Sequence, residues 1–212
     1  MKIIQRVIKR FQPYGYLPKR YSQLYKIVNR VMPINIIEIG TWNGDNAIRM
    51  IKIAKKYHPK KSINYFGFDL FENLSQKKLK DEMSLRPLHK KEFYEKLGKT
   101  GVNVQLFQGD TILTLPEALK NLPVPDLVFI DGGHSLKTVA SDWKNIKNII
   151  SSQTAVIFDD YWVNQTSAGC KPLIDSIDRV IYEVDILPIF DIHDSQRLGK
   201  RVTHMVEVRV KK

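Results

Sequence analysis

Three aspartates and one histidine in the second half of the chain have the types and spacing that can do chemistry. Asp131 closes an apolar run and is followed by two glycines and His134, and Asp159 and Asp160 close the next apolar run. If both runs are neighbouring parallel strands, the three carboxylates lie about 5 Å apart at the edge where such sheets bind ligands. Three oxygen donors without sulfur favour Mg²⁺. The alternative is that Asp131 begins a turn and that Asp159 or Asp160 caps a helix.

A second candidate site lies in the stretch 35–44, an apolar run that breaks into a glycine-bearing loop. It contains Glu38, Gly40, Thr41 and Gly44, and a helix-like stretch begins directly afterwards. This order predicts a buried strand, a tight turn and a helix whose N-terminal N–H groups approach a ligand. The dinucleotide-binding pattern G-x-G-x-x-G is absent, and Glu-x-Gly-x-x-x-Gly stands in its place.

Two further acidic residues follow the next predicted strands. Asp69 ends the apolar run 63–69, where a carboxylate can accept both hydroxyls of a ribose, although a turn or cap role fits it equally well. Gly109 and Asp110 follow the run 102–107, and Asp110 is also suited to cap the helix expected from residue 112.

These residues need a sheet that brings strand ends together, and the rest of the pattern predicts one. Apolar runs alternate with helical stretches, and the terminal runs 181–187 and 202–210 suit an edge hairpin joined by a polar loop. We therefore expect an α/β fold, with a Rossmann-like seven-stranded, mostly parallel sheet, a C-terminal antiparallel hairpin and helices on both faces.

The chain divides into a basic N-terminal arm with a covering helix, residues 1–33, and one domain, residues 34–212. Within this domain, the polar segment 71–100 is longer than a simple crossover needs, and we expect a lid-like insertion over the site.

Composition narrows the class of protein. The chain has 212 residues, a net charge of +12 and one cysteine, Cys170, so it has neither an internal disulfide nor a cysteine-based zinc site. We interpret the positive charge mainly as a solvated surface, with steering of an anionic substrate or membrane as the alternative. No apolar run approaches the roughly 20 residues that span a bilayer, and the first ten residues are too charged for a signal peptide. These features predict a cytoplasmic protein.

The glycine loop together with Asp69 resembles motif I and the second strand of class I S-adenosylmethionine-dependent methyltransferases. The segments 129–134 and 158–161 further resemble the metal-dependent O-methyltransferase branch that includes macrocin O-methyltransferase and the cephalosporin hydroxylase-like group (methyltransferase family 24). The resemblance implies a methyltransferase domain with S-adenosyl-L-methionine as cofactor and Mg²⁺ or a similar divalent cation. The residues on which these roles would fall are, for the cofactor, Glu38, Gly40, Thr41, Gly44, Asp69, Gly109 and Asp110; for the metal, Asp131, Asp159 and Asp160; and for catalysis, His134 as general base with Asp131.

The expected acceptor is a hydroxyl of a small molecule or a sugar. A divalent ion lowers the pKa of the bound hydroxyl and a base removes its proton. An RNA ribose methyltransferase is the alternative that the charge favours, although the chain lacks the Pro-Pro-Tyr that base-amino methyltransferases carry after strand four. A second alternative is a non-catalytic S-adenosylmethionine-binding protein.

His193 and the three remaining histidines are interpreted as structural or surface residues, and Trp42, Tyr161 and Trp162 as a candidate apolar wall. A homo-oligomer is compatible with the sequence.

Overall fold

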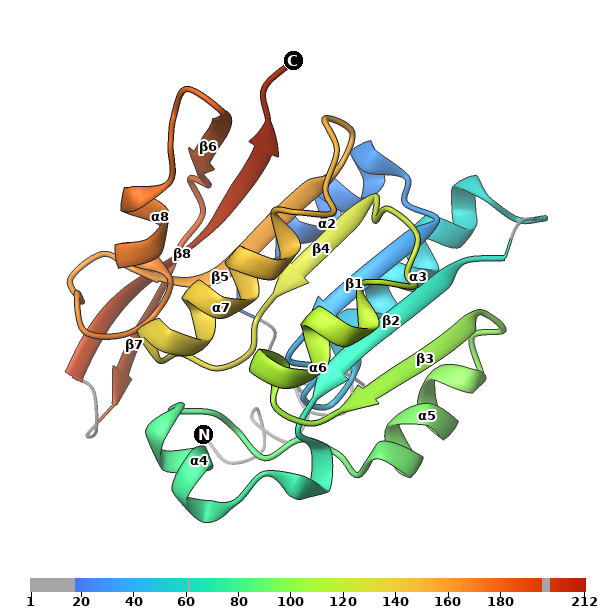
Figure 1. The fold of residues 1–212 in the computed structure, drawn as a ribbon, viewed down its shortest axis with the longest axis horizontal. Helices are drawn as coiled ribbons and strands as arrows, with labels where there is room; N and C mark the ends of the chain where they lie inside the picture. The colour runs from blue at the N-terminus through green and yellow to red at the C-terminus, as the bar shows by residue number, and fades with distance from the viewer. Residues whose placement is uncertain (1–17, 61, 196–198) are drawn as a thin grey trace, which may run out of the picture.

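The computed structural model describes residues 18–60, 62–195 and 199–212, and it shows one sheet with helices on both faces (Figure 1). The strands of its main path, in spatial order, are β3 (Asn103–Gln108), β2 (Asn64–Asp69), β1 (Asn35–Ile39), β4 (Leu127–Ile130), β5 (Ala155–Trp162), β8 (Gly199–Val210) and β6 (Tyr182–Ile186). The pairs from β3 to β5 are parallel, and β8 is antiparallel to its neighbours. The predicted fold class is confirmed.

One strand was missed. Part of the expected polar loop forms β7 (Asp191–Ser195), which pairs with the first half of β8 and makes the described sheet eight-stranded. The long β8 pairs with β7 near its beginning and with β6 near its end, and it pairs with β5 on the other side. The β7–β8 hairpin therefore extends beyond the carboxyl end of β5.

Two hydrophobic cores lie on opposite faces of the sheet, because successive strand residues point to opposite sides. Ile36 belongs to the core beneath the first helical layer, and Ile37 belongs to the other core. The first layer consists of α2 (Tyr21–Val31), α3 (Asp45–Tyr57) and α5 (Lys90–Gly98). The second layer consists of α6 (Thr111–Ala118), α7 (Leu136–Ile146) and α8 (Lys171–Ser176), and α6 and α7 lie at the front in Figure 1.

The segment 71–100, expected to be an insertion over the site, has two parts. Its first part contains the 3₁₀ helix η1 (Phe71–Asn73) and α4 (Gln76–Asp81). The residues of this part that line the main cavity are Leu74, Lys78, Glu82, Met83, Ser84 and Leu85. Its second part is α5, whose Phe93 and Leu97 are fully buried in the first core. Only the first part therefore lies where a lid would lie.

The predicted arm falls largely on residues 1–17, which lie outside the described residues, and the covering helix is α2. Across the residues that the structure describes, no helix is both long enough and apolar enough to cross a bilayer.

A bulge in β5 determines the direction in which the side chains of Asp159 and Asp160 point. The pairing of β5 with β8 shifts register between Phe158 and Tyr161, and Asp160 has a φ of +59°, in the left-handed region. Successive residues of a regular strand point to opposite faces, whereas a bulge breaks that alternation. This irregularity lets Asp159 and Asp160 both face the carboxyl edge of the sheet.

Candidate functional site

A cavity of about 480 Å³ opens at the carboxyl ends of the parallel strands. Its lining comes from the loop after β1, the ends of β2 and β3, the α4 segment, the loop after β4, and the β5 bulge with the β7–β8 hairpin. This is the edge at which open α/β sheets bind ligands. Parts of the chain that are far apart in sequence therefore meet around one space.

The loop after β1 is organised by Asp69 at the end of β2. One carboxylate oxygen of Asp69 accepts hydrogen bonds from the backbone N–H of Thr41 (2.7 Å), from the Thr41 hydroxyl (3.0 Å) and from the N–H of Trp42 (3.2 Å). Its other oxygen accepts the N–H of Phe71 at 3.2 Å. Gly40, with a φ of +84°, packs so closely on the Asp131 backbone that a Cβ there would overlap its carbonyl. The loop is thus held open by a carboxylate and a glycine.

The predicted cofactor residues divide into two groups in the structure. Those that line the cavity are Gly40, Asp69, Gly109 and Asp110, and those that lie outside its lining are Glu38, Thr41 and Gly44. Thr41 and Gly44 belong to the loop after β1 but do not face the cavity: Thr41 is buried, and Gly44 directly precedes α3. The assignment of Glu38, Thr41 and Gly44 to the cofactor site stays a prediction, and in this structure these three residues lie behind the cavity wall.

Glu38 is a buried carboxyl group within the sheet rather than a cavity wall. Its side chain accepts a short hydrogen bond from the Tyr65 hydroxyl, and only 1% of the residue is exposed. Burial raises the pKa of Glu38 to about 8, against the opposing effect of the Tyr65 hydrogen bond. In this structure, Glu38 therefore links β1 to β2 through Tyr65.

Asp110 caps a helix, as one of its two predicted roles requires, and its cofactor role stays a prediction. It caps α6 by accepting the N–H of Ile112 at 3.1 Å, it pairs with Lys78 of α4, and it lines the cavity. The α4 segment is thereby fixed to the corner after β3 by an ion pair.

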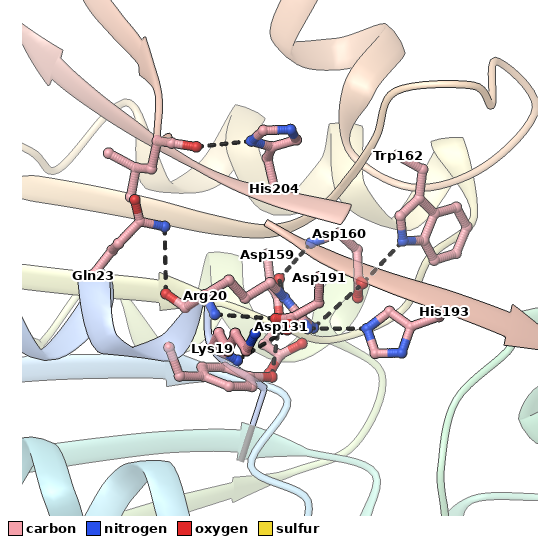
Figure 2. Close-up of polar contacts among 12 residues, drawn as sticks. Lys19, Arg20, Gln23, Asp131, Asp159, Asp160, Trp162, Asp191, His193 and His204 are labelled. Atoms are coloured by element: carbon pink, nitrogen blue, oxygen red, sulfur yellow. Dashed lines mark hydrogen bonds and ion pairs between the residues drawn. The ribbon is translucent and has the colours of Figure 1, made fainter. Parts of the chain in front are cut away.

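The three aspartates Asp131, Asp159 and Asp160 do converge, and each offers an oxygen within 4.8 Å of the others. The structure also places a cation among them (Figure 2). Arg20, directly before α2, donates to both oxygens of Asp159, from Nε at 2.6 Å and from Nη2 at 2.8 Å. The Tyr21 hydroxyl contacts Asp159 at 2.8 Å and Asp131 at 3.0 Å. The start of α2 thus supplies the partners of this acidic cluster.

The position of Arg20 is itself fixed by β7. Asp191 accepts the N–H groups of Lys19 and Arg20, both at 3.0 Å, and lies 3.3 Å from the Arg20 guanidinium. Only 6% of the Arg20 side chain and none of the Asp159 side chain are exposed. Burial lowers the pKa of Arg20, but Asp159 raises it more, so the guanidinium stays charged. Arg20 is a buried positive charge with a bidentate partner.

Among the described residues, five of the six oxygens of the three aspartates already accept a hydrogen bond, and Oδ1 of Asp131 is the exception. Burial, with the charges of Asp159 and Asp160, holds the pKa of Asp131 well above its usual range. The donor set has the chemistry and spacing that Mg²⁺ needs. However, Arg20 and Tyr21 occupy the oxygens that the ion would take, so the residues as arranged do not fit a resident ion.

His134 lies beside this cluster with both ring nitrogens engaged. Nδ1 is 2.6 Å from the backbone carbonyl of Glu82, which can only accept, and Nε2 is 2.5 Å from Asp160. Burial lowers the pKa of His134, but Asp160 and the Glu82 carbonyl raise it more, so the net shift is upward from 6.5. The Trp162 indole donates to the other oxygen of Asp160 at 3.0 Å and its ring stacks on His134. The imidazole is therefore oriented by Glu82, with Nε2 directed at the carboxylate.

The cavity wall also contains residues that sequence reasoning missed. Arg20, Tyr21, Arg201 and Thr203 were not singled out, and His193, interpreted as structural or surface, lines the cavity and lies 3.2 Å from Arg20. The sequence offered only a weak signal for this hairpin, the polar–apolar–polar order of Asp191, Ile192 and His193.

The predicted aromatic wall is partly correct. Trp42 and Trp162 line the cavity, whereas the Tyr161 hydroxyl donates to Asp175 of α8, away from it. Cys170 is buried, as expected of a packing residue.

Comparisons with known proteins agree with this architecture. A family model described as "Methyltransferase domain" matches residues 37–161. No curated protein matches the sequence. The fold is similar to an O-methyltransferase from Bacillus cereus in complex with SAH, with 15% identity, a TM-score of 0.63, and coverage of 99% of this chain and 89% of that chain.

Two further solved structures share the fold. One is the O-methyltransferase TomG from Streptomyces achromogenes, involved in tomaymycin synthesis and bound to SAM, with 12% identity, a TM-score of 0.62, and 94% and 83% of the two chains covered. The other is precorrin-6y C5,15-methyltransferase from Geobacter metallireducens, with 14% identity, a TM-score of 0.55, and 93% of each chain covered.

Proposed function

The chain belongs to the methyltransferase-domain family, and from this premise we propose that it transfers a methyl group from S-adenosylmethionine to a hydroxyl of a small molecule or a sugar. Two of the similar structures are described as bound to SAM or SAH, and both are O-methyltransferases. The bound cofactor would supply a sulfonium methyl group, which an oxygen nucleophile accepts by in-line displacement.

The cavity supports a cofactor of this kind. Gly40 removes side-chain bulk from the loop after β1, and Asp69 fixes that loop and faces the same space. In the proposed complex, Asp69 binds the ribose hydroxyls, and Gly109 and Asp110 lie beside the adenine. A volume of about 480 Å³ falls within the range of pockets that hold ligands of this size.

The observation that carries the choice of a hydroxyl acceptor is the oriented pair His134–Asp160 at the cavity wall. Because the Glu82 carbonyl requires a proton on Nδ1, Nε2 is the nitrogen that can take up and release a proton. Loss of the proton that Nε2 shares with Asp160 leaves a base within the cavity. An acceptor hydroxyl that takes the place of Asp160 at Nε2 gives its proton to that nitrogen as its oxygen attacks the methyl carbon, and the C–S bond of the cofactor breaks to release SAH.

The reaction proposed here has no step through a metal. The Mg²⁺ expected from the sequence stays a prediction, and the contacts of Arg20 with Asp159 argue against a resident ion in this arrangement. The charge that an ion would contribute near the acidic cluster is supplied by Arg20, held between Asp159 and Asp191. Tyr21 bridges Asp131 and Asp159 and so keeps the two strand ends together.

The test compares binding with turnover in the purified full chain. Calorimetric titration with SAH should show saturable binding in the wild type and the same affinity in His134→Gln, because His134 lies at the acceptor end. Formation of SAH from S-adenosylmethionine, screened against hydroxylated small molecules and sugars, should occur only in the wild type. Absence of SAH binding in the wild type would overturn the methyltransferase proposal, and full turnover by His134→Gln would overturn the assigned base.

A further inference from the structure

We propose that the methyl acceptor carries an anionic group, a carboxylate or a phosphate, and that Arg201 on the β7–β8 wall of the cavity binds it. This inference rests on the proposed function, because it assigns a substrate class to the same cavity. Its basis is the contact pattern of Arg201, His193, Thr203 and Trp162.

The hairpin presents these side chains together. His193 is the register partner of Arg201, and Thr203 follows Arg201 by two residues, so the three lie on one face of the hairpin. All three line the cavity. The Arg201 guanidinium lies over the Trp162 ring at 4.5 Å, and the His134 ring stacks on the same residue at a centroid distance of 5.3 Å. Arg201 and the proposed base therefore contact the same indole.

Among the described residues, the arginines and lysines that line the cavity are paired with carboxylates, with one exception. Arg20 pairs with Asp159, Lys78 pairs with Asp110, and His134 pairs with Asp160. On the acidic side, Asp45 pairs with Lys96, while Asp69 and Glu82 accept several hydrogen bonds from backbone N–H and hydroxyl groups. Within residues 18–60, 62–195 and 199–212, Arg201 is a cavity-lining cation without a carboxylate in salt-bridge range.

Two buried polar atoms at this wall also lack partners. Nε of Arg201 and Oγ1 of Thr203 are inaccessible to solvent and make no hydrogen bond within the described part of the chain. A buried donor left unsatisfied costs about 1–3 kcal/mol. The planar guanidinium fork matches the two oxygens of a carboxylate or a phosphate. An oxyanion on the acceptor would satisfy this site, and the adjacent Trp162 ring would cover its apolar part.

The carboxylate of the cofactor is the other source of such an anion, and the sheet order favours the acceptor. Asp69 lies on β2 and Arg201 on β8, four strand positions apart, which corresponds to roughly 19 Å at the usual strand spacing. A cofactor whose ribose contacts Asp69 and whose methyl group reaches His134 leaves Arg201 on the far side of the reacting atoms. The group bound there then belongs to the acceptor.

The experiment uses the full chain labelled with ¹⁵N-arginine and saturated with SAH. Its Nε–H spectrum is followed during separate titrations with inorganic phosphate and with glucuronate, and glucose serves as the uncharged probe. The Arg201 resonance is assigned by its absence in Arg201→Gln. The matched control is Lys200→Gln, which removes the same charge one residue away from a side chain that is exposed and outside the cavity lining.

We expect the Arg201 resonance to shift saturably with phosphate, glucuronate or both, and not with glucose. In the variants, the affinity for the probe is measured from the shifts of the remaining arginine resonances. It should fall at least tenfold in Arg201→Gln and stay unchanged in Lys200→Gln. Arg201→Lys, which keeps the charge but loses the fork, should give an intermediate affinity.

Three outcomes would overturn the inference: no saturable shift with either anion, equal affinity in Arg201→Gln, or a tenfold loss of SAH affinity in Arg201→Gln. The last result would assign Arg201 to the cofactor carboxylate. Thermal unfolding of each variant shows that a loss of binding does not reflect unfolding. Failure of the wild type to bind SAH is a separate result that overturns the methyltransferase proposal, and the anion titrations can then be read on the ligand-free chain.

Discussion

Replacement of Arg20 by methionine tests how much the buried guanidinium of this residue stabilises the fold. The change removes the bidentate contact with Asp159, whose side chain is fully buried, and leaves that carboxylate with the Tyr21 hydroxyl and the N–H of Asp160. Removing one partner of a buried ion pair costs about 3–5 kcal/mol. For a domain of this size, each kcal/mol lowers the melting temperature by about 2–4 °C. The expected decrease is therefore roughly 6–20 °C.

The assay is thermal unfolding followed by circular dichroism, with Arg30→Met as the control. Arg30 lies in the last turn of α2 and pairs with Glu207. Because 49% of its side chain is exposed and the buried Glu207 keeps Arg209 as a partner at 3.3 Å, the loss of Arg30 should cost no more than about 1 kcal/mol. In the double variant Arg20→Met/Asp159→Leu, part of the lost stability should return, because the uncompensated charge is gone. A melting temperature for Arg20→Met within 2 °C of that of Arg30→Met would refute the reasoning.

The same variant, Arg20→Met, tests whether Arg20 takes the place of a divalent ion among the three aspartates. Without the guanidinium, the three carboxylates are free to bind Mg²⁺, and binding to the folded state raises the melting temperature. We expect millimolar Mg²⁺ to stabilise Arg20→Met and to leave the wild type unchanged. An equal rise in both proteins would show that Arg20 does not keep the ion out, and would favour the metal site expected from the sequence.

Three further outcomes follow from the geometry. Because the pKa of His134 is raised above 6.5, its basic form increases as pH rises through that higher value, so kcat should increase with pH above 6.5; a flat profile argues against the base. Glu38 has a pKa of about 8 instead of 4.5, so its contribution to stability is present below pH 4.5 and is lost as pH rises to 8. The free energy of unfolding in urea should therefore rise for Glu38→Gln relative to the wild type between pH 4.5 and pH 8. A constant difference between the two proteins across this pH range would contradict the prediction. Gly40→Ala should be destabilised by more than about 1 kcal/mol, because of its positive φ and the Asp131 carbonyl; an unchanged urea midpoint would contradict that.

Much of the fold could be predicted from local patterns. The apolar run before Gly40 and the run before Asp131 are strands buried on both faces, and such runs carry their own signal. The adjacency of β4 and β5, on which the convergence of Asp131 with Asp159 depends, follows from the usual arrangement of alternating α/β chains. Hairpin β7–β8 was missed because its first strand is short and polar, and a two-residue alternation over five residues is a weak signal.

The candidate site was predicted only in part. Strand-end acids stand out because the sheet edge is where ligands bind, and Asp69, Asp131, Asp159 and Asp160 all lie there. Their partners could not be read in the same way. A carboxylate looks the same in the sequence whether a metal ion, a backbone N–H or an arginine neutralises it.

The sequence by itself determined the strand–loop–helix order, the glycine that lets the first loop pack on Asp131, and the acids at the strand ends, because these depend on backbone sterics and on local periodicity. Only the tertiary structure decided that Arg20, 139 residues before Asp159, is its partner, and that Arg201 faces the cavity with no carboxylate partner among the described residues. Such contacts join segments whose separation along the chain carries no local signal. They are set by the packing of α2 and the β7–β8 hairpin against the edge of the finished sheet.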